Sequence, residues 1–199
     1  MKERGFTLLE VSIVLGVILI LIAILVPSIE KNITDAKVAR ALSDSREIAK
    51  AMIEARKDLG KWPIEDSSTL HNSCRVLIGS KPTVSGAYLP PPGCGNPCNW
   101  KKEPAETIYY QLVDPSNHYP KLNPNPHNYP SWNGPYINDT KLDPWGKAYL
   151  INSAFLDNGP DADITRRIFV ISGGPNNLMN TYFDGTREIE GDDVGFKIR

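Results

Sequence analysis

Residues 5–26 read GFTLLEVSIVLGVILILIAILV, and this stretch decides the architecture of the chain. Its one charged side chain is Glu10. As a helix, the part from Phe6 to Val26 would span about 32 Å, enough to cross the hydrocarbon core of a bilayer. A carboxylate inside such a segment costs about 2.5–3.5 kcal/mol at the bilayer centre. Simple anchoring does not require this charge, so Glu10 predicts a further task for the helix.

Two ordinary explanations of the apolar segment fit less well. A cleaved secretory signal has a shorter apolar region and a small-residue cleavage site, whereas Pro27-Ser28-Ile29 follows here. A plain signal anchor fits the length of the segment but leaves Glu10 unexplained. Basic residues lie both before and after the segment, so the positive-inside rule does not decide its orientation.

The N-terminal hexapeptide Gly5-Phe6-Thr7-Leu8-Leu9-Glu10, followed by the apolar run, resembles the class III leader junction of type IV pilins and type II secretion pseudopilins. The resemblance implies that a prepilin peptidase cuts after Gly5 and methylates Phe6. Residues 1–5 would then be a leader, and the apolar helix would be retained. The new amino terminus is ordinarily protonated, with a pKa of about 7.7–8. In a filament, Glu10 of one subunit would pair with the amino group of Phe6 on a neighbour and fix the axial register.

An amphipathic pattern follows the apolar run and predicts that the helix continues. Apolar residues recur at helical spacing between Ile29 and Leu59, and Gly60 followed by Pro63 predicts its end. The expected division is a transmembrane, filament-core half at 6–27 and an amphipathic half at 28–60. Pro27 lies at their junction and favours a kink there. In assembled pili of the resembling family the helix melts locally near such a proline, which implies the same here.

Residues 61–199 are expected to form a globular head with a Pro-rich insertion at about 82–135. That insertion holds twelve of the seventeen prolines, too many for long helices or central strands. Its aromatic side chains are expected to pack onto the head, with a binding surface as the alternative. Candidate strands at 148–152, 167–172 and 194–198 predict a small antiparallel sheet that packs against the amphipathic helix. The predicted fold class is α+β and pilin-like.

A second resemblance lies in the head. The stretches Trp132–Ile137 and Leu142–Tyr149 resemble the W-x-G-P-Y and DPWG-x-x-Y signature of the type II secretion major pseudopilin. Asp, Pro and Gly in DPWG are turn-forming residues, so their roles are structural.

The two resemblances together imply a structural subunit of a type IV-like filament. The chain would form a homopolymer at an inner-membrane assembly platform. Before assembly it would be held in membrane lipid, with the C-terminal body outside the cytoplasm. After assembly it would belong to a periplasmic or extracellular filament.

The resemblance also implies a calcium site near the C-terminus. The matching stretch offers Asn176, Asn177, Asp192 and Asp193 as oxygen ligands. Asparagine stands where the family usually has aspartate, and the intervening segment is longer, which implies weaker binding or none. The sequence suggests no other cofactor.

The three cysteines are Cys74, Cys94 and Cys98. An exported body allows their oxidation, and their odd number leaves one thiol free or available to another chain. A disulfide that staples a loop is expected, either between Cys94 and Cys98 or between Cys74 and one of them. Zinc is not favoured, because Cys-x3-Cys has no second ligand pair at a standard spacing.

Composition and motifs exclude several function classes. The net charge of −1 provides no basic field for nucleic acid. The chain lacks G-x-S-x-G, H-E-x-x-H and a phosphate-binding glycine loop, so we expect no enzyme. Two rival hypotheses stay open: a type IV pilin for adhesion or motility, and a membrane-anchored exported binding protein or enzyme that uses the Pro-rich region.

Overall fold

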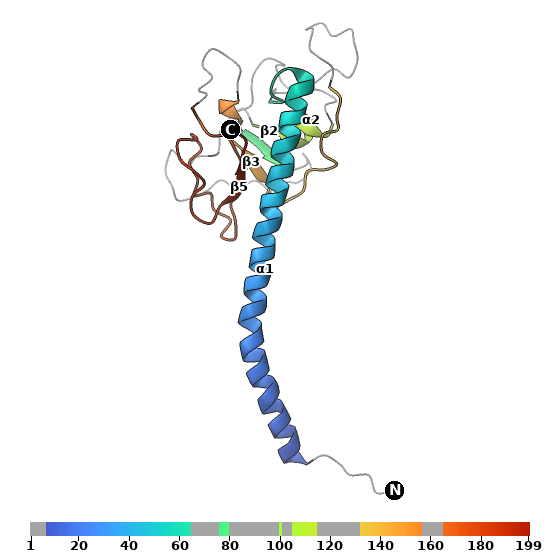
Figure 1. Cartoon of the computed structure of the whole chain (residues 1–199), viewed down its shortest axis with the longest axis vertical. Helices are drawn as coiled ribbons and strands as arrows, with labels where there is room; N and C mark the ends of the chain where they lie inside the picture. The colour runs from blue at the N-terminus through green and yellow to red at the C-terminus, as the bar shows by residue number, and fades with distance from the viewer. Residues whose placement is uncertain (1–6, 65–75, 80–99, 101–104, 115–131, 157–164) are drawn as a thin grey trace. The chain divides into compact units, whose positions relative to one another are not determined.

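The computed structural model describes residues 7–64, 76–79, 100, 105–114, 132–156 and 165–199 (Figure 1). Gly5, Phe6 and the three cysteines lie outside these residues, so the cleavage site and the disulfide stay predictions. The chain divides into two compact units, Met1–Lys37 and Val38–Arg199.

Helix α1 runs from Leu8 to Leu59, 52 residues, and contains Pro27 in its interior. It ends immediately before Gly60, as the sequence predicts. The helix is unbroken at Pro27 in the single chain, and the local melting that the resemblance implies for the assembled filament stays a prediction. A proline removes one backbone hydrogen bond, and the turns on either side keep their helical bonds.

Within the first unit, α1 is apolar on all sides from Val11 to Val26. Its large apolar side chains between Leu8 and Ile33 are exposed. One helix among the described residues is long and apolar enough to cross a membrane, with a mean hydropathy of 3.1 over its most apolar window and none of that window buried. A helix that is apolar all round requires lipid or other helices around it.

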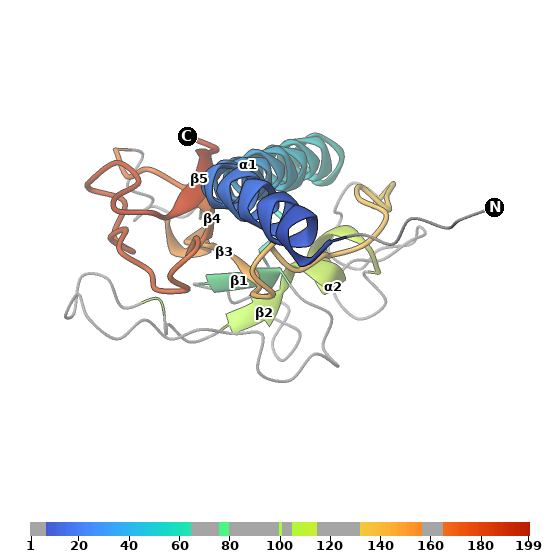
Figure 2. The same ribbon diagram turned by 90° about the horizontal axis from the view of Figure 1, so that it is seen from below.

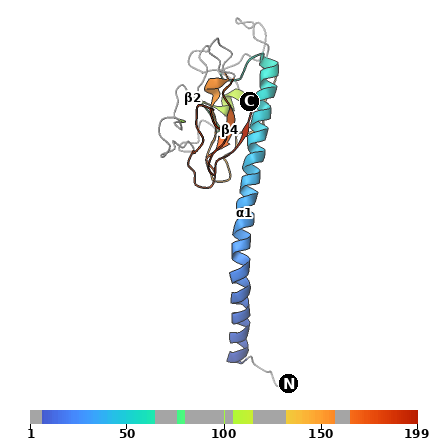
Figure 3. The same cartoon turned by 60° about the vertical axis from the view of Figure 1, so that its left-hand side comes forward.

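Within the second unit, the C-terminal part of α1 has a single buried face. The buried residues recur every three or four positions, which is the spacing of one helical face; they are Ala41, Ser45, Ile48, Ala49, Ala51, Met52, Ala55 and Leu59. Four of these eight residues are alanines, whose small side chains allow close approach of the packed layer. Figure 3 shows the head lying along this part of α1.

The head contains a five-stranded sheet of order β2-β1-β3-β4-β5 (Figure 2). Strands β1, β3, β4 and β5 pair antiparallel, and β2 pairs parallel with β1. Their bounds are Val76–Gly79 for β1, Ala105–Thr107 for β2, Tyr149–Ile151 for β3, Phe169–Ser172 for β4 and Val194–Lys197 for β5. The antiparallel α+β fold is confirmed, and β1 and β2 are additions to the predicted strands.

The Pro-rich insertion contains regular structure that the sequence analysis did not predict. Strand β2 is followed directly by the short helix α2, Ile108–Leu112. The stretch AETIYYQLVD that carries them has no proline, although Pro104 and Pro115 flank it. The high proline content of the region therefore describes its flanks rather than this segment.

Both faces of the sheet are buried. Tyr149, Ile151 and Val170 belong to the core that includes α1. Their neighbours along the strands belong to a second core on the opposite face, which also includes Trp100, Met179 and Phe183. Burial on both faces explains why β3 and the first three residues of β4 are apolar in succession instead of alternating with polar residues.

Trp100 shows that part of the insertion packs onto the head, as expected. Its side chain is fully buried, and its Nε1 donates a hydrogen bond to the carbonyl oxygen of Thr181 over 2.9 Å. The ring meets Phe183 edge-on, with 5.4 Å between centroids. The 3-10 turn η2, Ser153–Phe155, follows β3 and places the Phe155 ring beside that of Phe183.

Candidate functional site

The N-terminus of α1 is closed by a reciprocal pair of side chains, Thr7 and Glu10. Glu10 Oε2 accepts hydrogen bonds from the backbone N–H of Thr7 at 2.9 Å and from its Oγ1 at 2.8 Å. The backbone N–H of Glu10 donates to Thr7 Oγ1 at 3.3 Å. This is a capping box, which satisfies N–H groups that a helix start leaves without partners. The T-x-x-E spacing is visible in the sequence, but the sequence analysis assigned Glu10 only to pairing between subunits.

The DPWG segment forms a tight turn that is tied to the sheet. Asp143 Oδ1 accepts from the backbone N–H of Trp145 at 3.0 Å and of Lys147 at 2.7 Å. Its Oδ2 accepts from Ser172 Oγ at the end of β4, over 2.5 Å. Asp143 is only 4% exposed, so its hydrogen bonds within the protein take the place of hydrogen bonds to water. The structural role predicted for this turn is confirmed.

Two tyrosine hydroxyls connect the 132–149 segment to α1. Tyr136 Oη donates to Asp58 Oδ2 over 2.9 Å, and Tyr149 Oη donates to Asp44 Oδ2 over 3.1 Å. Burial, reinforced by the Asp58 carboxylate, raises the pKa of Tyr136 to about 12. Burial and Asp44 likewise raise the pKa of Tyr149. Both hydroxyls therefore stay protonated as donors, and they fix the signature segment against the helix.

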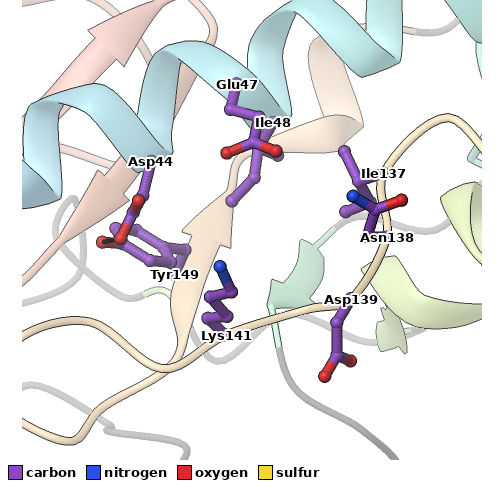
Figure 4. A pocket seen from close by; sticks show the side chains of 8 residues that line it. All are labelled: Asp44, Glu47, Ile48, Ile137, Asn138, Asp139, Lys141 and Tyr149. Carbon is purple, nitrogen blue, oxygen red and sulfur yellow. Dashed lines mark hydrogen bonds between the residues drawn. The ribbon is translucent and has the colours of Figure 1, made fainter.

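A small pocket of about 50 Å³ lies where α1 meets the segment before β3 (Figure 4). Lys141 points into it from the loop, and Asp44 and Glu47 approach from the helix. The lining residues are Asp44, Glu47, Ile48, Ile137, Asn138, Asp139, Lys141 and Tyr149. The hydroxyl of Tyr149 is the one hydroxyl among them, and it is bound to Asp44 with a raised pKa. This hydroxyl is therefore not an activated nucleophile.

The residues between β4 and β5, 173–193, form a segment that we call the C-terminal loop. Its two ends approach closely, because a Cβ at Gly174 would overlap the carbonyl oxygen of Asp192. Gly174 has a φ of 62°, which favours glycine. Its backbone N–H donates to Ser172 Oγ over 3.2 Å, so the Asp143 turn and the loop share one serine.

The loop brings two of the four residues that the resemblance assigns to calcium, Asn176 and Asp192, into direct contact. Asn176 donates to Asp192 from its backbone N–H at 3.1 Å and from Nδ2 at 2.5 Å. Asp193 is 8% exposed, and its Oδ2 accepts from the backbone N–H of Asn180 at 2.9 Å and of Thr181 at 2.7 Å. Burial outweighs these bonds and raises the pKa of Asp193 to about 6. Asn177 has a φ of 58°, and its Oδ1 is buried without a hydrogen-bond donor in the described part of the chain.

The oxygens of this loop do not fit calcium as they are arranged. Calcium takes about six to eight oxygen ligands, whereas the carboxylate oxygens of Asp192 are already held by N–H donors. Of the carboxylate oxygens here, Asp193 Oδ1 alone lacks a partner in the described residues. Throughout those residues, no three His, Cys, Asp or Glu side chains come together to hold a metal.

Comparison with known proteins supports the N-terminal interpretation. A family model described as the prokaryotic N-terminal methylation motif matches residues 1–26. The chain is 28% identical over 117 residues to the type II secretion system core protein G of Pectobacterium carotovorum subsp. carotovorum. That alignment covers 59% of this chain and 70% of the relative. No solved structure matches the chain.

The methylation motif, the exposed apolar helix and the α+β head together support a pilin-like protein. The similarity to core protein G supports, more particularly, a protein of the pseudopilin type. Pilins and pseudopilins are structural subunits, so the expectation that the chain is not an enzyme is confirmed. The prepilin-like leader and the apolar helix are consistent with anchoring in a membrane.

Proposed function

We propose that this protein is the major pseudopilin of a type II-like secretion system. In this proposal, a prepilin peptidase cuts after Gly5 and methylates Phe6, and an inner-membrane assembly platform polymerises the product. The subunit waits in the inner membrane with its C-terminal body outside the cytoplasm. The finished homopolymer is a periplasmic or extracellular filament.

The observation that carries the proposal is the exposed apolar part of α1 together with the methylation motif that precedes it. A leader that is removed on the cytoplasmic side leaves this helix in the mature protein. In lipid, neighbouring helices gain little from the hydrophobic effect and associate by close packing. Gly16 supports such packing, since it has open space around its backbone and lies amid large apolar side chains.

Glu10 supports the proposal because its hydrogen bonds leave its charge uncompensated. Thr7 donates two hydrogen bonds to the Glu10 carboxylate, but no cation contacts it among the described residues. Cleavage after Gly5 would create an ammonium group at Phe6, within a few residues of this carboxylate. A buried charge requires a partner, so we propose that Glu10 receives the Phe6 ammonium of an adjacent subunit and sets the register.

The head fits a structural rather than a catalytic task. Its buried polar residues in the signature region, such as Asp143, are used for turns and for connections between segments. In the proposed filament, residues 6–27 of many subunits form the centre and residues 61–199 form the surface. The amphipathic residues 28–60 join the two.

The test is the N-terminus of the native protein extracted from membranes, measured by intact mass and by terminal peptide sequencing. The proposal expects a chain that begins at methylated Phe6. A chain that begins at Met1, or after Pro27, contradicts it. Electron microscopy of sheared surface fractions then separates the alternatives: long constitutive surface fibres would favour a pilin for adhesion or motility, and short fibres that appear on overproduction would favour a pseudopilin.

A further inference from the structure

Two consecutive carboxylates, Asp192 and Asp193, close the C-terminal loop and require compensation for their charge. They receive it from nitrogen donors. Asp192 Oδ1 accepts from Asn176 Nδ2 at 2.5 Å and from Asn180 Nδ2 at 3.1 Å. Counting the backbone donors of Asn176, Asn180 and Thr181, the two carboxylates accept five N–H bonds.

The amide of Asn176 is held in one orientation. Its Oδ1 accepts a hydrogen bond from the backbone N–H of Leu178 over 2.6 Å. A backbone N–H can only donate, so the atom facing Leu178 must be oxygen and the atom facing Asp192 must be the NH₂ group. The assignment of the two amide ends, which is often ambiguous, is therefore settled by chemistry at this residue.

The Asn176 NH₂ group thus occupies the coordination space of Asp192 that a cation would need. Hydrogen bonds to a carboxylate are about twice as strong as neutral ones, and two side-chain amides share the same oxygen here. The bond from Asn176 also spans the loop, because it joins a residue just after β4 to one just before β5.

We propose that the C-terminal loop is closed by the side-chain amides of Asn176 and Asn180 in place of a divalent cation, so that the head keeps its stability without calcium. The proposal concerns the folding of the head and goes beyond the proposed function. In this proposal, Asn176 holds Asp192 in position. Replacing the amide nitrogen of Asn176 by a carboxylate oxygen, as in Asn176→Asp, would give the loop a site with three carboxylates.

The experiment measures thermal unfolding of the purified full chain in detergent, once with a chelator and once with millimolar calcium. For the unaltered chain, we expect the two melting temperatures to agree within about 1 °C. Asn176→Asp places a negative group against Asp192, so we expect its melting temperature to fall by roughly 5 °C with chelator and to recover with calcium. Asn133→Asp is the matched control, since it adds the same charge at an exposed position and should change neither value.

Asn176→Ala keeps the test decisive if the aspartate variant does not fold. It removes the amide without adding charge, so we expect a lower melting temperature with chelator than the unaltered chain has. The proposal is overturned if calcium raises the melting temperature of the unaltered chain by several degrees and Asp192→Asn abolishes that rise. It is equally overturned if Asn176→Ala melts at the same temperature as the unaltered chain. Neither outcome depends on cleavage or filament formation, so failure here is distinct from failure of the proposed function.

Discussion

Replacing Asn152 by alanine should remove a large part of the stability of the head. Asn152 is fully buried at the end of β3. Its Nδ2 donates to the carbonyl oxygens of Arg167 at 2.9 Å and Phe183 at 3.0 Å. Its Oδ1 accepts from the backbone N–H of Phe169 at 2.8 Å. One side chain therefore satisfies three backbone groups from segments that are distant in sequence.

The magnitude follows from the groups that alanine would leave behind. A buried polar group without a partner costs about 1–3 kcal/mol, so three such groups, with partial relaxation, give a loss of about 3–6 kcal/mol. The total stability of a domain is about 5–15 kcal/mol. With a urea dependence of about 2 kcal/mol per molar, the unfolding midpoint should fall by roughly 1.5–3 M.

The assay is urea unfolding of the full chain in detergent, followed by tryptophan fluorescence. Trp100 is a suitable reporter because it is fully buried beside Phe183. Asn138→Ala is the matched control: Asn138 is exposed, and the change should stay within about 0.5 kcal/mol. Asn152→Asp keeps the shape but turns an oxygen toward two carbonyls, so it should be at least as damaging as alanine. A midpoint for Asn152→Ala equal to that of the control would refute the reasoning.

Three further predictions concern other parts of the chain. Glu10→Gln keeps the capping box, which accepts glutamine, but removes the charge, so it should abolish filaments in electron micrographs. Thr7→Ala loses the cap and keeps the charge of Glu10, so this variant should still form filaments. Gly174→Ala introduces a Cβ that overlaps the carbonyl oxygen of Asp192 at a φ of 62°; the melting temperature should fall by roughly 5–10 °C, and an unchanged value would show that the loop can open there. Burial lowers the pKa of Lys61 from 10.5 to about 8. Between these pH values the folded state binds fewer protons than the unfolded state, so the stability of the protein should rise as the pH increases through that range. Urea midpoints at several pH values should show the rise, and Lys61→Met should remove it.

The features that the sequence predicted are those with local causes. Gly60 marks the end of α1, because a glycine there tolerates the backbone that ends a helix. The DPWG turn depends on four neighbouring residues. The strands β3, β4 and β5 overlap the predicted segments, and β3 and most of β4 are short apolar runs.

The features that it missed depend on distant partners or on a neighbouring motif. Strand β1 has four residues, and its partners are β2 and β3, far along the chain. Asn152 looks like a residue that ends a strand, and nothing local indicates that it binds the backbone of Arg167, Phe169 and Phe183. The capping box at Thr7 is predictable from the sequence, because T-x-x-E before an apolar run is a known helix-start pattern.

The place of β2 in the sheet has a consequence for how this head can vary. β2 is the outermost strand on its side and joins the sheet through β1 alone. The strands that enclose the core with α1 are β1, β3, β4 and β5, and each pairs antiparallel with the next. Helix α2 follows β2 directly, and its Ile108 and Leu112 are buried in the core that includes α1. Changes of sequence in β2 itself therefore alter the rim of the head, whereas changes in α2 would reach the layer against the helix. One scaffold can thus present different outer faces without altering the part that lies against α1.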